Sequence, residues 1–124
     1  MKNIDIIAIV NAYQKGTGDM ALPASVSWTR RLNMVKLINA KKIIDEAMQE
    51  IQMRYADDDH SEAAEDGKRQ VKQEYIAEFI KAQDDILSQD TDIDVKKISI
   101  ETLGDIALTD AQMDTLAFMI EEGE

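Results

Sequence analysis

Three residues near the start of a long predicted helix have the clearest chemical potential: Trp28, Arg30 and Arg31. A helix N-terminus offers unpaired backbone N–H groups, arginine offers forked donors, and an indole can stack on a base. No acidic residue lies between Asp19 and Asp45. The pattern therefore predicts a site for a small anionic ligand such as a nucleotide. In the alternative interpretation Trp28 lies in the core, and the arginines pair with an acidic helix or with the acidic surface of a partner.

Other patterns suited to chemistry are incomplete. Asp90, Asp92, Asp94 and Glu101 have the spacing of calcium ligands, but Val95 replaces the glycine that the loop needs at its turn, and alternating apolar residues favour a strand. The pair Gly16 and Gly18 lacks the other glycines of a phosphate loop, so we interpret residues 16–19 as a turn.

His60 is the only histidine, and neither a histidine metal site nor a Ser-His-Asp triad has the partners it needs. The chain has no cysteine, so thiol chemistry is excluded. We interpret His60 as a surface residue in an acidic loop. The sequence thus predicts no catalytic residue, no metal ion and no cofactor, and a protein that is not an enzyme.

The candidate ligand residues belong to a helix expected over residues 22–56. Apolar residues recur there at steps of three and four, while charged residues and glutamine fill the positions between them. The stripe consists of Leu37, Ala40, Ile44, Met48, Ile51 and Tyr55. Pro23 suits the first turn, because its missing N–H removes a donor that would be unpaired there. A helix this long needs a partner to cover its stripe.

That partner is a second helix expected over residues 68–88, with an acidic loop between the two. Its stripe consists of Val71, Tyr75, Phe79, Ala82 and Ile86, widened by Ile76, Ile80 and Leu87. Two long amphipathic helices joined by a short polar segment pack most simply as an antiparallel hairpin, here residues 22–88. Residues 3–14 have helical spacing, although their isoleucine content would also suit a strand.

The remaining elements complete a mostly α-helical fold with a short β segment, in a single domain over residues 1–124. Residues 92–100 alternate apolar with polar, which predicts one strand or two short strands with a bend at Lys96–Lys97. Such a strand needs a pairing partner. Thr109 and Gln112 form a capping box that begins a C-terminal helix over residues 109–122.

The composition restricts the partners. The net charge is −11 and the sequence pI is about 4.4, which argues against nonspecific binding to duplex nucleic acid. No apolar run approaches the roughly 20 residues that span a bilayer, so we expect no membrane contact and a cytoplasmic protein. The wide stripe of the second helix and the unpaired strand predict a homo-oligomer, most simply a dimer.

Taken in order, the chain resembles a family of small proteins of unknown function from bacteriophages and prophages of Gram-positive bacteria. The resemblance rests on the isoleucine-rich start at residues 4–10, on Leu22-Pro23 before the long helix, and on the charged hairpin before Ile93-Asp94-Val95. It also includes Leu108-Thr109 followed by Leu116, Phe118, Met119, Ile120 and Glu121.

The resemblance implies a host-cell protein that acts by stoichiometric binding. One hypothesis is that it inhibits a host defence component, either a protein or a sequestered nucleotide signal. The other is that it is an assembly, scaffolding or minor structural partner of phage proteins, acting through helix–helix interfaces.

Overall fold

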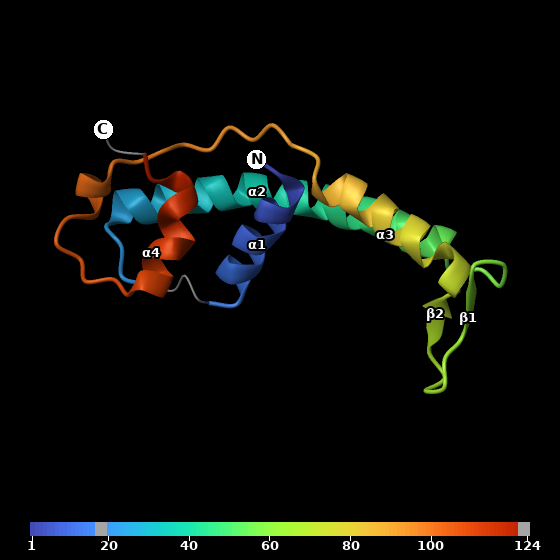
Figure 1. Ribbon diagram of the computed structural model, residues 1–124. Coiled ribbons are helices and arrows are strands. Elements are labelled where there is room, and N and C mark those ends of the chain that lie inside the picture. The colour runs from blue at the N-terminus through green and yellow to red at the C-terminus, as the bar shows by residue number, and fades with distance from the viewer. Residues whose placement is uncertain (17–19, 122–124) are drawn as a thin grey trace.

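A long helix, α2, runs through most of the molecule, and the other elements are arranged along it (Figure 1). The computed structural model describes residues 1–16 and 20–121. The helices are α1 (Asn3–Gln14), α2 (Ala24–Arg54), α3 (Gln73–Leu87) and α4 (Asp110–Leu116). Two strands, β1 (Ser61–Ala63) and β2 (Arg69–Val71), and two 3-10 turns, Ile100–Leu103 and Ala117–Met119, complete the described elements. The predicted mostly helical fold with a long α2–α3 hairpin is confirmed.

The first core cluster joins α1 to the middle of α2. Ile6 and Val10 of α1 pack against Met34, Leu37 and Ile44 of α2, and all five are buried. Residues 3–14 therefore form the predicted helix rather than a strand. The long stripe of α2 is its buried face, as the spacing of its apolar residues indicated.

The second core cluster joins the start of α2 to the C-terminal region. Val26 packs there against Leu103, Leu116 and Met119. The predicted capping box is present: the Gln112 N–H donates to Thr109 Oγ1 at 3.1 Å, and the Thr109 N–H donates to Gln112 Oε1 at 3.0 Å. The expected helix over 109–122 is shorter, because a 3-10 turn follows Leu116. The end of the predicted helix, at Glu122, lies outside the described residues, as do Thr17, Gly18 and Asp19 of the predicted turn.

The end of the helical hairpin differs from the prediction. The second long helix begins at Gln73 instead of residue 68, because residues 69–71 pair antiparallel with residues 61–63. The physical reason is local turn chemistry. Gly67 takes a positive φ of 82°, and the Lys68 N–H donates to Asp66 Oδ1 at 3.0 Å. Val71, predicted in the helix stripe, consequently lies in β2.

Residues 90–99, which we call the strap, form an extended segment beside α2, and the strand predicted for residues 92–100 is wrong (Figure 1). The strap makes only isolated bridges among the described residues, Lys2 with Asp90 and Ile98 with Ile120. Side chains of α2 replace a partner strand. The Asn33 amide donates to Lys96 O and accepts from the Lys96 N–H, each at 2.9 Å, and Lys36 Nζ donates to Asp94 O at 2.7 Å. The alternating apolar residues of the strap pack on the two core clusters.

The β-hairpin is anchored by aromatic contacts at the end of α2. The His60 ring lies between Tyr55 and Tyr75, with centroid distances of 5.4 and 4.6 Å. Tyr55 is buried and its hydroxyl donates to Glu78 Oε2 at 2.9 Å; burial, followed by this hydrogen bond, raises the pKa of the phenol. His60 Nδ1–H donates to Asp57 Oδ1 at 2.6 Å, and this hydrogen bond is the main cause of a lowered pKa at Asp57.

The Asp57–His60 contact predicts a pH dependence of stability. Because the pKa of Asp57 in the folded protein lies below its ordinary value of 3.8, its contribution is complete above that pH and is lost as pH falls through the folded pKa. Asp57→Asn should lower the urea midpoint at pH 6, and the difference from the native protein should shrink as pH falls below 3.8. A difference that stays constant from pH 6 to pH 2.5 would contradict the assignment. Asp59→Asn, also exposed, is the control.

None of the helices in the described part of the chain is both long and apolar enough to cross a membrane.

Candidate functional site

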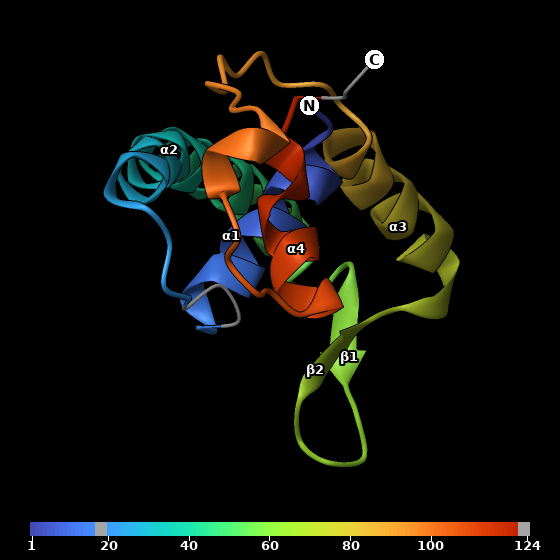
Figure 2. The same ribbon diagram turned by 90° about the vertical axis from the view of Figure 1, so that its left-hand side faces the viewer.

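The side of α2 that faces away from the other helices is apolar. It carries Trp28, Leu32, Val35 and Ile43, with Asn39 between the last two, and we call these five residues the outer face. Trp28 is 61% exposed, Val35 53% and Ile43 68%. Steps of four, three and eight residues put these side chains on one side of a helix. Figure 2 shows α2 along one side of the molecule, with α1, α3 and α4 on its other side.

Sequence reasoning missed the outer face because it followed a single stripe along α2. The signal was available: Trp28, Leu32 and Val35 also have helical spacing, on the side opposite Leu37 and Ile44. Large apolar side chains gathered on an exposed face indicate an interaction surface more often than scattered single residues do.

Charged side chains beside the outer face are segregated along the helix. Toward the N-terminus they are basic, Arg31 and Lys36, and the basic Lys42 follows just past the middle of the helix. Toward the C-terminus they are acidic: Asp45, Glu46 and Glu50. All six of these residues are exposed. Asp45 is also ion-paired with Lys41, whose Nζ lies 2.7 Å from Asp45 Oδ2. The charges beside the outer face thus change sign between Lys42 and Asp45.

The structure separates the three residues predicted to bind an anion. Trp28 is exposed on the outer face, so the alternative that placed it in the core is wrong. Arg30 is 8% exposed, and its guanidinium carbon lies 4.8 Å from the centre of the Tyr13 ring of α1. This cation–π contact helps to hold α1 against α2. Arg31 is exposed.

Arg30 and Arg31 nevertheless line one open pocket of about 430 Å³ between α1 and the start of α2. Tyr13, Gln14 and Ser27 also line it, whereas Trp28 does not. The structure therefore brings the two arginines together without the indole. A ligand there would meet guanidinium groups and the tyrosine ring, but it could not stack on Trp28.

The pocket leads to a prediction about anionic ligands. If a nucleotide binds there, it should stabilise the folded protein by about 2.7 kcal/mol at a ligand concentration of about 100 Kd. The melting temperature should rise as a result. Arg31→Ala should abolish the shift without changing the melting temperature of the free protein. Arg30→Ala should also lower the melting temperature of the free protein, because the contact with Tyr13 is lost. Lys42→Ala, at an exposed position outside this pocket, is the control. A panel of cyclic and linear nucleotides without any shift would contradict the site.

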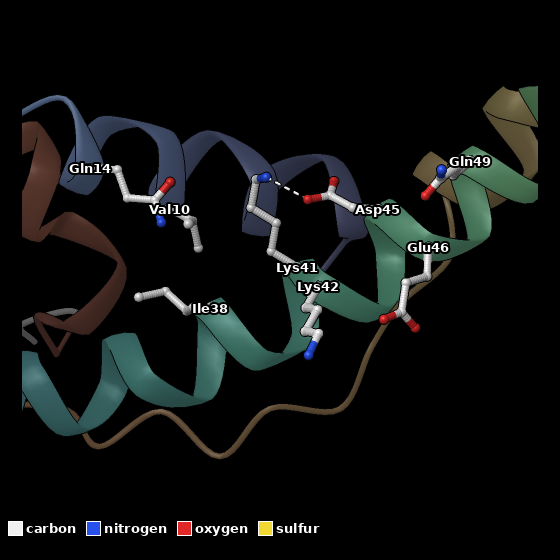
Figure 3. Close-up of a pocket in the computed structure, with 8 residues that line it drawn as sticks. All are labelled: Val10, Gln14, Ile38, Lys41, Lys42, Asp45, Glu46 and Gln49. Atoms are coloured by element: carbon white, nitrogen blue, oxygen red, sulfur yellow. Dashed lines mark hydrogen bonds and ion pairs between the residues drawn. The ribbon is translucent and has the colours of Figure 1, made fainter.

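A second open pocket, of about 350 Å³, lies between α1 and the middle of α2 (Figure 3). Val10 and Gln14 come from α1, and the α2 side chains include the Lys41–Asp45 ion pair drawn with a dashed line. Lys42 and Glu46 add one further charge of each sign. Because the two signs balance, this pocket favours neither an anion nor a cation.

Most of the net charge lies in residues 55–94, which we call the acidic segment. It includes the β-hairpin, α3 and the start of the strap. It contains 13 acidic and 4 basic residues, a net charge of −9 out of the −11 of the whole chain. Every one of its acidic residues is exposed. The acidic segment therefore exposes carboxylates to solvent along its whole length.

Within residues 1–16 and 20–121, no group of three or more histidine, cysteine or acidic side chains is placed to hold a metal ion. The four residues with the spacing of calcium ligands, Asp90, Asp92, Asp94 and Glu101, are thus not gathered into such a group. Comparison with protein families, with curated proteins and with solved structures finds no match to this chain.

Proposed function

We propose that this chain is a non-enzymatic, phage-encoded binding protein that acts in the host cytoplasm by stoichiometric capture of a host defence component. The phage origin rests on the resemblance of its sequence patterns to small phage proteins. The observation that carries the binding mode is the acidic segment, with 13 acidic residues that are all exposed. A surface of this kind complements a basic protein surface and speeds association with it.

The distribution of the carboxylates favours binding over turnover. Acid–base catalysis needs two groups whose environments differ, usually within a cleft. The acidic side chains of residues 55–94 are instead spread over the β-hairpin, α3 and the strap, and all lie in contact with solvent. A basic target protein would use them together as an electrostatic surface.

The test is a pull-down from infected cells with the tagged full chain, repeated at low and high salt. Electrostatic capture should weaken markedly as salt rises. Neutralising three exposed residues of the β-hairpin region, as Asp59→Asn, Glu62→Gln and Glu65→Gln, should remove the captured protein. The matched control neutralises three exposed residues outside the acidic segment, Glu101→Gln, Asp105→Asn and Glu121→Gln. If the amount of captured protein changes neither with salt nor in the β-hairpin variant, the proposal is refuted.

The outer face of α2 supports a second candidate function, an assembly or scaffolding partner of phage structural proteins. Trp28, Leu32 and Val35 suit a helix–helix interface, which depends on apolar burial rather than on charge. A phage structural protein captured equally at low and high salt, and lost with Val35→Glu, would favour this function over the first.

A further inference from the structure

One pocket of this acidic protein is lined by basic side chains. It lies between the end of α1 and the start of α2 and has a volume of about 430 Å³. Its described lining residues include Arg30 and Arg31, and none of them is acidic. A cavity lined by one sign of charge concentrates ions of the opposite sign. The pocket is therefore suited to an anion, although the net charge of the chain is −11.

The chain around the pocket carries the same sign of charge. Residues 6–16 and 20–44 contain only basic charged residues, which are Lys15, Arg30, Arg31, Lys36, Lys41 and Lys42. The acidic Asp114 of α4 lies beside α1, but it lines a separate pocket with Ala8 and Ala12. Neither the described wall of the arginine pocket nor the neighbouring turns of α1 and α2 thus place a carboxylate beside an incoming anion.

The two helices hold the guanidinium groups in place. Arg30 and Arg31 follow Ser27 by three and four residues, so all three side chains lie on one side of α2. The guanidinium carbon of Arg30 is 4.8 Å from the centre of the Tyr13 ring, and Arg30 is only 8% exposed. A guanidinium that is already oriented in this way loses little side-chain freedom when a ligand binds.

The pocket has no free aromatic surface for a nucleobase. Trp28 does not line it, and Tyr13 is the one aromatic residue among the described lining residues. The Tyr13 ring packs against the first core cluster and carries the Arg30 guanidinium over one face. The protein's own side chains therefore use this ring. The pocket can recognise anionic oxygens, but it offers no platform on which a base could stack.

The number of donors favours phosphate over carboxylate. A guanidinium group donates in a fixed fork that fits the oxygens of either group. Two such forks offer more N–H donors than one carboxylate can accept, whereas a diphosphate has enough oxygens for both. We propose that the pocket binds small phosphorylated molecules through a diphosphate group, whatever base or sugar is attached. The site lies outside the acidic segment, so this binding goes beyond the proposed capture of a basic protein.

The first experiment measures binding to the native full chain by isothermal titration calorimetry without divalent cations. Pyrophosphate, ADP, GDP and CDP should bind with dissociation constants that agree within about fivefold, because all of them present a diphosphate. Adenosine and guanosine should not bind, and citrate should bind more weakly than pyrophosphate. No binding of pyrophosphate, tighter binding of citrate, or a preference of more than about tenfold for one nucleotide would overturn the proposal.

The second experiment assigns the binding to the two arginines. Arg31→Gln should weaken pyrophosphate binding about tenfold or more, because a charge-assisted contact is lost. Arg30→Lys keeps a cation beside Tyr13 but loses the fork, so it should also weaken binding. The matched control is Lys42→Gln, at an exposed basic residue outside this pocket, which should bind like the native protein.

The melting curve of each variant shows whether it is folded. Because Arg31 is exposed, Arg31→Gln should melt like the native protein, and it keeps the test decisive even if Arg30→Lys unfolds. Native affinity in folded Arg31→Gln, or an equal loss of affinity in Lys42→Gln, would overturn the assignment to this pocket.

The fluorescence of Trp28 tests whether a base stacks outside the pocket. Trp28 is the only tryptophan and is 61% exposed. ADP bound through its phosphates should change the emission no more than pyrophosphate does. Saturable quenching by ADP that pyrophosphate does not produce would indicate stacking on the indole and would overturn the independence from the base.

A last comparison separates this site from the acidic segment. The β-hairpin variant, neutralised at Asp59, Glu62 and Glu65, should lose the captured basic protein but keep its affinity for pyrophosphate. Arg31→Gln should lose affinity for pyrophosphate but still capture the protein. Loss of pyrophosphate binding in the folded β-hairpin variant would overturn the phosphate site, whereas loss of protein capture alone bears only on the proposed function.

Discussion

Replacing Ile44 by Asp should unfold the protein at room temperature. Ile44 is 4% exposed and packs with Ile6 and Val10 of α1 in the first core cluster. A carboxylate at that position would lose its hydration without gaining a partner, at a cost of several kcal/mol. Since domains of this size are stable by only about 5–15 kcal/mol, that cost removes most or all of the margin.

The measurement is the far-UV circular dichroism of the purified variant, with thermal or urea unfolding of any folded fraction. The matched control is Ile43→Asp, which introduces the same charge one residue away on the exposed outer face. This control should keep its helical spectrum, because the Ile43 side chain is exposed. A cooperative transition in Ile44→Asp at the native midpoint would show that the cluster is not the core of the fold.

The second large effect is expected at Asn33, where Asn33→Ala should lower the free energy of unfolding by about 2–3 kcal/mol. The side chain is 1% exposed and bonds to both the N–H and the C=O of Lys96. Its removal leaves these two strap groups without a protein partner and opens a gap beside Met119, whose sulfur also accepts from the Asn33 amide at 3.9 Å.

Hydrogen exchange localises this effect. The amide of Lys96 should exchange faster in Asn33→Ala than in the native protein, by more than global destabilisation explains. Gln49→Ala, at an exposed position of the same helix, should change stability by less than about 0.5 kcal/mol. Unchanged stability together with unchanged Lys96 exchange would mean that the strap does not depend on Asn33.

Three elements show what local sequence determines. The capping box at Thr109 and Gln112 forms as predicted because both hydrogen bonds join groups three residues apart, and no distant partner is needed. Residues 3–14 form a helix with the predicted bounds. The buried face of α2 likewise follows from steps of three and four, because one orientation of the helix buries all residues of its apolar stripe at once.

The strap and the β-hairpin show where local reasoning failed. Alternation in residues 92–100 indicates an extended backbone but not what pairs with it, and the pairing groups are side chains of α2 some 60 positions earlier in the chain. At the β-hairpin, the positive φ of Gly67 allows a tight turn. Residues 69–71, which were predicted in the helix, therefore pair with β1 instead. In both cases the local pattern does not distinguish the competing structures. The Asn33 side chain decides the conformation of the strap, and the turn at Gly67 decides that of the β-hairpin.

By itself the sequence determined a mostly helical chain, the long helix with its buried stripe, the capped C-terminal helix, and a net charge of −11, of which −9 lies in residues 55–94. Only the tertiary structure decided that Trp28 faces solvent, that Arg30 stacks on Tyr13, and that Asn33 rather than a strand holds the strap. The physical reason is that periodicity gives the relative directions of side chains on one helix. Which of those directions is covered depends on how α1, α4 and the strap pack around α2, and contacts between residues far apart in the chain settle that packing.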